Sequence, residues 1–201
     1  MSARPRLGVL GGSFDPPHLG HVVIASEAAS CLGLERVLFV PAGAPPHKEA
    51  GDRSPAALRL TMTELAVQED MRFLASALEI ETGLAYTHDT LREVIARHEG
   101  REVVFIMGSD SLLQFDTWND PEGILELCTL AVAPRPGDDP GVVAAAAARW
   151  GKDKVTILDS PPLAISSSGL RARVAAGRPI RYLVTEPVGD FILQHKLYRP
   201  A

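Results

Sequence analysis

Short apolar runs alternate along this chain with longer stretches of helical length. The apolar runs predict strands and cover residues 7–10, 36–40, 71–80, 101–107, 127–133 and 155–158. The intervening stretches predict helices over residues 19–34, 55–68, 88–98 and 142–150, where Leu58, Met62, Leu65 and Ala66 form the apolar stripe of the second. Regular alternation of strands and helices predicts a Rossmann-like α/β fold, a doubly wound parallel sheet in a three-layer α/β/α arrangement.

Length and composition favour a single core. The chain has 201 residues, of which 46% are hydrophobic, enough to bury one core. We therefore expect one domain over residues 1–201, with residues 160–201 as a C-terminal helical part. Cys31 and Cys128 are the only cysteines, and each lies in a predicted apolar element, so both are expected to be buried free thiols.

Charge and hydropathy limit the partners. A net charge of −5 argues against a protein built for general nucleic-acid binding, which needs a basic surface. No apolar run is long enough to span a bilayer, and the first six residues lead into a strand without the pattern of a signal peptide. We expect a cytoplasmic protein that binds neither nucleic acid nor membrane.

The segment of residues 11–21, Gly-Gly-Ser-Phe-Asp-Pro-Pro-His-Leu-Gly-His, lies between a predicted strand and a predicted helix. We call it loop 11–21. Gly11 and Gly12 let the backbone approach a ligand closely, and the following helix directs N–H groups at a bound anion. His18 and His21 share a helix face and can donate to phosphate oxygens. Two histidines at this spacing also occur as surface residues or metal ligands, but no third zinc ligand is evident nearby.

Two further loops carry candidate side chains whose roles the sequence leaves open. Lys48, after a proline pair, is either a solvated charge or a phosphate contact. Asp110, after the fourth strand, is either a helix cap or a carboxylate that accepts from ribose hydroxyls. Trp118 is either a core anchor or a stacking platform for a flat ring. All three follow strands, where ligands gather in open α/β sheets.

A run of serines, Ser166 to Ser168, opens the last region of the chain. Serines at such a position are typical helix caps. Together with Arg171 one turn later, they also form a second candidate anion site. Two such sites in one small chain suggest a triphosphate held at both ends.

Loop 11–21 closely resembles the signature of the HxGH nucleotidyltransferase superfamily, whose members transfer a nucleotidyl group from a nucleoside triphosphate to a phosphate-bearing acceptor. Later segments narrow the resemblance to bacterial nicotinate-nucleotide adenylyltransferases. These segments are residues 45–48, 86–91, 108–110 with Trp118, 135–137, 165–171 and 182–184 with the ending Leu197-Tyr198. The matches run from Gly11 to Tyr198 and cover nearly the whole chain.

The resemblance implies a set of site residues. For ATP they are Gly11, Gly12, Ser13, Phe14, His18, His21, Gly108, Arg135, Ser167, Ser168 and Arg171. For the acceptor they are Lys48, Tyr86, Thr87, Asp110 and Trp118, with the nicotinate ring on Trp118 and on backbone groups near Tyr86 and Thr87. His18, His21, Lys48 and Arg171 are the expected catalytic residues.

The resemblance also implies the partners and the reaction. The substrates are ATP and nicotinate mononucleotide, and Mg²⁺ arrives with ATP without a metal site of the protein's own. The phosphate of the mononucleotide attacks the α-phosphorus in line, so neither a general base nor a covalent enzyme intermediate is required. Homo-oligomerisation stays open.

Two competing interpretations remain. In the first, the acceptor is nicotinamide mononucleotide or pantetheine phosphate; Trp118 and the chain length argue against the latter. In the second, the chain is a non-catalytic nucleotide-binding module, and the intact His18, His21, Lys48 and Arg171 argue against it.

Overall fold

A six-stranded, fully parallel sheet forms the centre of the molecule, which we describe from a computed structural model over residues 4–43 and 53–200. The strands are β1 (Arg6–Gly12), β2 (Leu34–Pro41), β3 (Phe73–Ala75), β4 (Glu102–Gly108), β5 (Thr129–Ala133) and β6 (Val155–Ile157). Their order is β3-β2-β1-β4-β5-β6. The chain therefore winds outward from β1 and then outward again from β4, which confirms the predicted doubly wound sheet and puts its topological switch point between β1 and β4.

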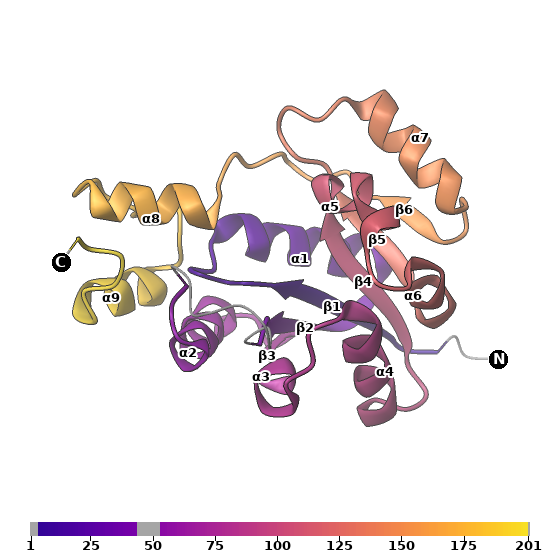
Figure 1. Cartoon of the computed structure of the whole chain (residues 1–201), viewed down its shortest axis with the longest axis horizontal. Coiled ribbons are helices and arrows are strands. Elements are labelled where there is room, and N and C mark those ends of the chain that lie inside the picture. The colour runs from indigo at the N-terminus through magenta and orange to yellow at the C-terminus, as the bar shows by residue number, and fades with distance from the viewer. Residues whose placement is uncertain (1–3, 44–52, 201) are drawn as a thin grey trace.

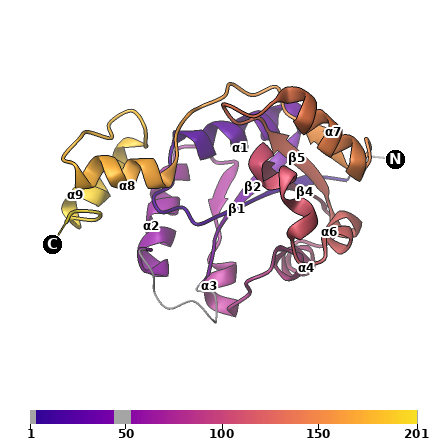
Figure 2. The same cartoon turned by 45° about the horizontal axis from the view of Figure 1, so that its top comes forward.

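Helices connect the strands and extend the chain beyond the sheet. They are α1 (Leu19–Leu32), α2 (Ala56–Val67), α3 (Leu78–Thr82), α4 (Thr87–Arg97), α5 (Ser109–Leu113), the 3-10 turn η1 (Phe115–Thr117), α6 (Pro121–Leu127), α7 (Pro140–Trp150), α8 (Ser167–Ala175) and α9 (Glu186–Gln194). Figures 1 and 2 show α8 and α9 together at one end of the molecule, with α4, α6 and α7 at the other. None of the helices in the described ranges combines the length and the apolar character needed to cross a bilayer. That residues 1–201 form one domain stays a prediction.

The core lies on both faces of the sheet, because successive side chains of a strand point to opposite faces. In β4, Val104 and Ile106 join a cluster with residues of α1, α2, α8 and α9. Phe105 and Met107 join a second cluster with residues of α3 to α7. Both faces are thus covered, as expected for parallel strands that are nearly all apolar, and the three-layer prediction is confirmed.

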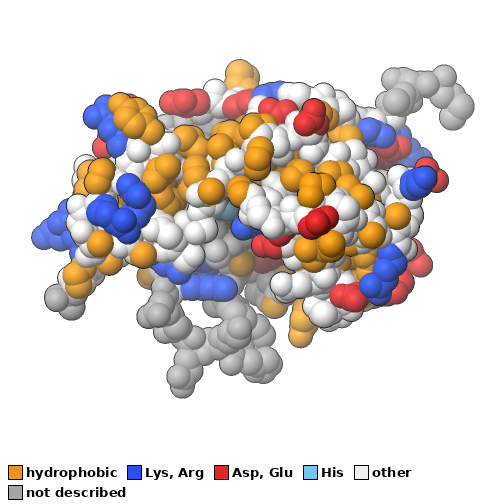
Figure 3. Space-filling model, turned by 90° about the horizontal axis from the view of Figure 1, so that it is seen from above, with side chains coloured by type: hydrophobic (Ala, Val, Ile, Leu, Met, Phe, Trp, Pro, Cys, Tyr) orange, Lys and Arg blue, Asp and Glu red, His pale blue; other side chains and the backbone are white. Residues whose placement is uncertain are grey.

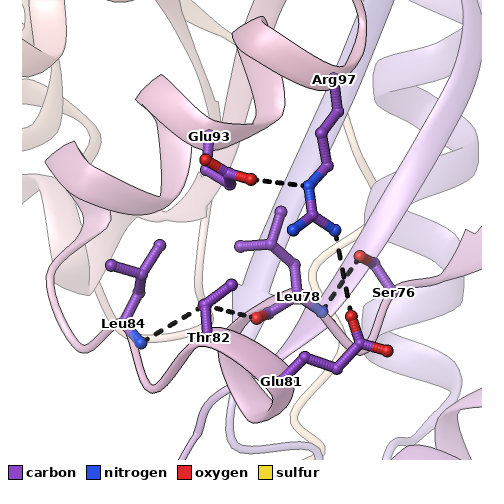
Figure 4. A network of polar contacts seen from close by, with 7 residues as sticks. All are labelled: Ser76, Leu78, Glu81, Thr82, Leu84, Glu93 and Arg97. Carbon is purple, nitrogen blue, oxygen red and sulfur yellow. Dashed lines mark hydrogen bonds and ion pairs between the residues drawn. The ribbon is translucent and has the colours of Figure 1, made fainter.

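Residues 71–80 differ from the prediction of one long strand. Only Phe73–Ala75 form β3, and the next apolar and acidic positions belong to the short helix α3. Thr82 closes that helix by donating from Oγ1 to the Leu78 carbonyl at 2.6 Å, and Arg97 of α4 lies 4.0 Å from Glu81 (Figure 4). Leu78 is the buried residue of α3. The alternation of apolar and acidic residues at positions 78–81 therefore belongs to a short helix at the sheet edge, where a strand was predicted.

The two cysteines have different environments. Cys128 is a buried free thiol as predicted, and burial raises its pKa to about 12. Cys31 is exposed, so the prediction of a buried thiol is wrong for this residue. The buried face of α1 carries Ala25, Ala28 and Ala29, and Cys31 lies off that stripe.

Candidate functional site

The predicted site residues gather where the carboxyl ends of β1, β4 and β5 meet. Loop 11–21 continues from β1, Asp110 follows β4, and Arg135 follows β5. Because β1 and β4 are neighbours across the switch point, the loops that follow them diverge and leave room for a ligand between them. Figure 3 looks down on the molecule and shows a little histidine surface beside basic and acidic side chains near the centre of this face.

Loop 11–21 is held by a phenylalanine in an unusual backbone conformation. Phe14 has a φ of 48° and a side chain with no exposed surface. A bulky residue adopts this left-handed region only when its surroundings hold it there. Its ring packs against Phe39, at 5.8 Å between centroids, and against the edge of His21 at 5.0 Å. The side chain therefore anchors the loop, and only its backbone can reach a ligand.

The two predicted catalytic histidines stack on each other at the start of α1. Their ring centroids lie 3.7 Å apart with an angle of 23° between the planes. The backbone N–H of His18 donates to Nδ1 of His21 at 3.1 Å. A neutral imidazole whose Nδ1 accepts must carry its proton on Nε2, so this contact assigns the tautomer of His21. His21 is thereby prepared as a donor through Nε2.

Both imidazoles are neutral near pH 7. Burial, with a smaller contribution from the positive charge of Arg135, lowers the pKa of His18 to about 4. Burial also lowers the pKa of His21 well below its usual value, and His18 and Arg135 add to the effect. Stacking of the rings explains the effect of His18 on the pKa of His21, because two positive charges at this distance repel each other.

The serine-rich start of α8 lies against loop 11–21, although the two are far apart in the sequence. Ser167 donates from Oγ to the Pro16 carbonyl at 2.8 Å, and Arg171 donates from Nη1 to the Asp15 carbonyl at 2.7 Å. Ser166 caps the helix as predicted, since its Oγ accepts from the Gly169 N–H. The two predicted anion sites are therefore neighbours.

Asp110 and Arg135 form an ion pair across the ends of β4 and β5, with 2.8 Å between Nε and Oδ1. A side chain on Gly108 would meet both groups, because a Cβ there would lie 2.5 Å from Asp110 Oδ1 and 2.8 Å from Arg135 Nε. Buried Ser109 fixes the backbone below them: its Oγ accepts from the Arg135 N–H at 2.8 Å and donates to Asp138 at 2.5 Å. Asp110 is thus paired, and its predicted contact with ribose stays a prediction.

Three of the residues predicted for the acceptor line a shallow pocket of about 230 Å³ together with Ala85 and Asn119. Tyr86, Thr87 and Trp118 all contribute to it. The indole of Trp118 also packs edge-on against Phe105 and Phe115, at 6.0 and 5.4 Å between centroids. Trp118 therefore packs against the core and also lines the pocket, and its predicted role as a stacking platform stays a prediction.

Two of the predicted acceptor residues need a separate description. Thr87 is the first residue of α4, and Tyr86 occupies the cap position with an extended backbone. Lys48 lies outside the described residues, so its predicted contact stays a prediction. In the described ranges no group of three or more His, Cys, Asp or Glu side chains could hold a metal ion.

Three polar residues in or next to loop 11–21 were not among the predicted site residues. They are Asp15, Arg59 and Tyr198. Asp15 has no exposed surface and Arg59 only 3%. Arg59 lies one turn before Met62 on the buried face of α2, and a charged residue on an apolar stripe was the signal that could have revealed it.

A larger cavity, of about 830 Å³, lies between α8 and α9. Val174, Ile180, Tyr182 and Ile192 are among its lining residues, and no predicted site residue is. The candidate chemistry therefore lies at the histidines and their neighbours, away from this larger cavity.

The fold and the site together define a nucleotidyltransferase, and the family model described as cytidylyltransferase-like matches residues 9–173. A protein of Corynebacterium kroppenstedtii is 41% identical over 200 residues, which cover 98% of this chain and 92% of that protein. A protein of Thermomicrobium roseum is 42% identical over 196 residues, which cover 96% and 92%. Both carry the name "probable nicotinate-nucleotide adenylyltransferase". The chain therefore belongs to the nicotinate-nucleotide adenylyltransferase family, as its motifs predicted.

A solved structure shares the fold. The nicotinic acid mononucleotide adenylyltransferase of Plasmodium falciparum complexed with NaAD has a TM-score of 0.79 at 18% identity, with 96% of this chain and 97% of that chain covered. At this identity the likeness concerns the fold alone. Coverage of nearly the whole of both chains means that the sheet and the C-terminal helices are arranged similarly in the two proteins.

Proposed function

We propose that this chain transfers the adenylyl group of ATP to nicotinate mononucleotide, which yields nicotinate adenine dinucleotide and pyrophosphate. The observation that carries the proposal is the stacked, neutral histidine pair at the start of α1, in which His21 has its proton on Nε2. Neutral donors in a buried position stabilise developing negative charge without needing to reorganise. Family membership supports the same reaction.

In the proposed reaction a phosphate oxygen of the mononucleotide attacks the α-phosphorus of ATP. A bond forms between that oxygen and the α-phosphorus, and the bond from the α-phosphorus to the bridging oxygen of pyrophosphate breaks. The attacking phosphate is already an anion near pH 7, so no residue has to remove a proton from it. The protein aligns the two phosphates and stabilises the charge that develops on them.

The residues of loop 11–21 and of α8 are proposed to hold the phosphates of ATP. His18 and His21 would donate to the α-phosphate, whereas Ser168 and Arg171 would reach the phosphates that leave as pyrophosphate. The Oγ of Ser168 forms a 3.3 Å hydrogen bond with Ser166 Oγ, which also accepts from the Gly169 N–H. Mg²⁺ is proposed to enter with ATP as part of that substrate, where it shares the phosphate charge.

The pocket of Tyr86, Thr87 and Trp118 is proposed to hold the pyridine ring. The indole offers a flat surface for stacking. The N-terminus of α4, which begins at Thr87, offers unpaired N–H groups and the positive end of a helix dipole. An anionic carboxylate gains more from that environment than a neutral amide does, which favours the acid nucleotide.

The test is pyrophosphate release from ATP and Mg²⁺ with three acceptors offered separately: nicotinate mononucleotide, nicotinamide mononucleotide and pantetheine phosphate. We expect a strong preference for the acid nucleotide, and a reaction without acceptor serves as the blank. Preference for another acceptor would contradict the proposed substrate. No release with any of the three would contradict catalysis and favour a binding module.

A further inference from the structure

A largely buried polar cluster joins loop 11–21 to the elements packed against it. Its central residue is Asp15, whose side chain is fully buried and accepts two hydrogen bonds. Tyr198, near the end of the chain, donates from its hydroxyl to Oδ1 at 2.6 Å, and the backbone N–H of Ser54 donates to Oδ2 at 3.0 Å. One carboxylate thus joins loop 11–21 to two distant parts of the chain. We call Asp15, Arg59 and Tyr198 the anchoring cluster.

Arg59 makes the second set of connections. Its guanidinium donates to three backbone carbonyls: to Ser13 at 2.9 Å, to Ala42 at 2.6 Å and to Ser54 at 3.0 Å. These carbonyls belong to loop 11–21, to the segment after β2 and to the residues before α2. A buried guanidinium that donates from Nε and both terminal nitrogens to backbone carbonyls holds those backbone segments in place. This positioning is its main role here.

The cluster also reaches the arginine of α8. Arg171 donates to the backbone carbonyl of Asp15, the residue whose carboxylate Tyr198 and Ser54 hold. A shift of Asp15 therefore moves loop 11–21 together with the carbonyl oxygen that accepts from Arg171. Burial and the contact with Asp15 raise the pKa of Tyr198 above its usual range, so its hydroxyl remains a donor over the working range of pH.

We propose that Asp15, Arg59 and Tyr198 are positioning residues, which hold loop 11–21 and Arg171 in the arrangement that binds the phosphates of ATP. None of the three is proposed to touch a substrate. The inference rests on the proposed function, because it assigns ATP to that loop. It predicts a selective effect, since among the described residues no hydrogen bond joins the pocket of Tyr86 and Trp118 to the cluster.

The first variant is Tyr198→Phe, which removes a single oxygen and keeps the ring. We expect kcat/KM for ATP to fall about three- to tenfold, because misplaced groups cost rate even when the fold is intact. KM for the mononucleotide is expected to stay within about twofold. Tyr182→Phe is the matched control, since Tyr182 is 78% exposed and lies outside the cluster. It should behave as the wild type.

A second variant tests the arginine. Arg59→Lys keeps the charge but cannot reach all three carbonyls, so we expect a loss of about tenfold or more in kcat/KM for ATP. Arg72→Lys, on an exposed arginine paired with Asp70, is the control. Each variant is assayed well below its own unfolding midpoint. Unchanged kinetics for ATP in both Tyr198→Phe and Arg59→Lys at that temperature would overturn the proposal and leave a purely structural cluster.

A double-mutant cycle separates the cluster from general weakening of the protein. Asp15→Asn and Tyr198→Phe should be strongly non-additive in kcat/KM for ATP, because both act on the same contact between the Tyr198 hydroxyl and Asp15. Asp15→Asn replaces the charged acceptor with a neutral amide, and Tyr198→Phe removes the donor. Asp15→Asn and Tyr182→Phe should be additive. Additivity in the first pair would overturn the proposal.

Calorimetric titration of each variant with ATP alone keeps this inference distinct from the proposed reaction, because it needs no acceptor. Weaker ATP binding in the cluster variants would support positioning even if the wild type proved silent with all three acceptors. Unchanged ATP binding together with unchanged kinetics would contradict it.

Discussion

The two ends of the site are built in opposite ways. At the end that we propose to bind ATP (the ATP end), His18 is only 7% exposed, and the loop that carries it is tied to α2, α8 and the C-terminal segment. At the end that we propose to bind the acceptor (the acceptor end), Tyr86 is 55% exposed and the pocket is small and shallow. The proposed reaction explains the difference. Charge develops at the ATP end and needs fixed donors, whereas the acceptor end has only to orient a flat ring.

The largest expected effect belongs to the ATP end. We expect His21→Ala to lower kcat by about 100-fold or more, which is the order found when one donor to a transition state is removed. KM for the mononucleotide should change little. Steady-state kinetics with each substrate varied in turn would measure both quantities.

His195→Ala is the matched control for His21→Ala. His195 also stacks on an aromatic ring, Phe191 at 4.0 Å, but it is exposed and lies just after α9. It should leave the rate unchanged. A His21→Ala enzyme with normal kcat and a raised KM alone would show that the pair contributes to binding and has no part in the transition state.

Burial of the ATP end also predicts a pH dependence of stability. Above pH 6.5 His18 is neutral in both the folded and the unfolded chain. Between pH 6.5 and about 4 the unfolded chain takes up a proton at this residue and the folded protein does not, because the pKa of folded His18 is about 4. As the pH decreases from 6.5 to about 4, His18 therefore lowers the free energy of unfolding by about 3 kcal/mol.

His18→Gln removes that contribution. Denaturant unfolding at several pH values should give a steeper loss of stability on acidification for the wild type than for the variant. His21 and the carboxylates titrate in both proteins, so the difference between the two curves isolates His18. Parallel curves would mean that His18 is not buried as a neutral group.

The contrast between the two ends also explains what the sequence could reveal. Loop 11–21 was predicted as part of the site from its residue types. Glycines let the backbone approach a ligand, prolines restrict the backbone of the turn, and histidines can donate to phosphate oxygens. The parallel sheet was predicted because strands such as β4 are buried on both faces and carry an unbroken apolar run, which in β4 covers Val103 to Met107. In both cases the local residue types carry the physical signal.

Other features depend on contacts between distant residues, which no local pattern encodes. Arg59 binds the carbonyls of Ser13 and Ala42, and Tyr198 binds Asp15 across nearly the whole length of the chain. The same limit explains the errors. Leu78 and Ile80 alternate with acidic residues as in a strand, but the chain turns into α3 there. Cys31 lies in an apolar segment, yet it is exposed.

At the acceptor end a smaller effect is expected. Trp118→Ala should raise KM for the mononucleotide by up to about tenfold, since a single aromatic contact is worth about 0.5 to 1.5 kcal/mol. The unfolding midpoint should also fall, because the indole packs against Phe105 and Phe115. Kinetics and thermal unfolding on the same sample separate the two losses.

Trp150→Ala is the control for packing. Trp150 also meets Phe115 edge-on, at 5.1 Å between centroids, but it does not line the acceptor pocket. It should lower the midpoint and leave KM unchanged. Equal effects of the two substitutions on KM would contradict a contact between Trp118 and the ring of the acceptor.

The smallest effect is expected at Tyr86. Its backbone occupies the cap position of α4, so removal of the side chain leaves the start of that helix in place. Tyr86→Ala should therefore raise KM for the mononucleotide about twofold, with kcat and stability unchanged, because an exposed ring makes a weak contact. Tyr182→Ala, on another exposed tyrosine, should have no effect. A loss of kcat in Tyr86→Ala comparable with that in His21→Ala would contradict this difference between the two ends. The acceptor end would then stabilise the transition state as the ATP end does.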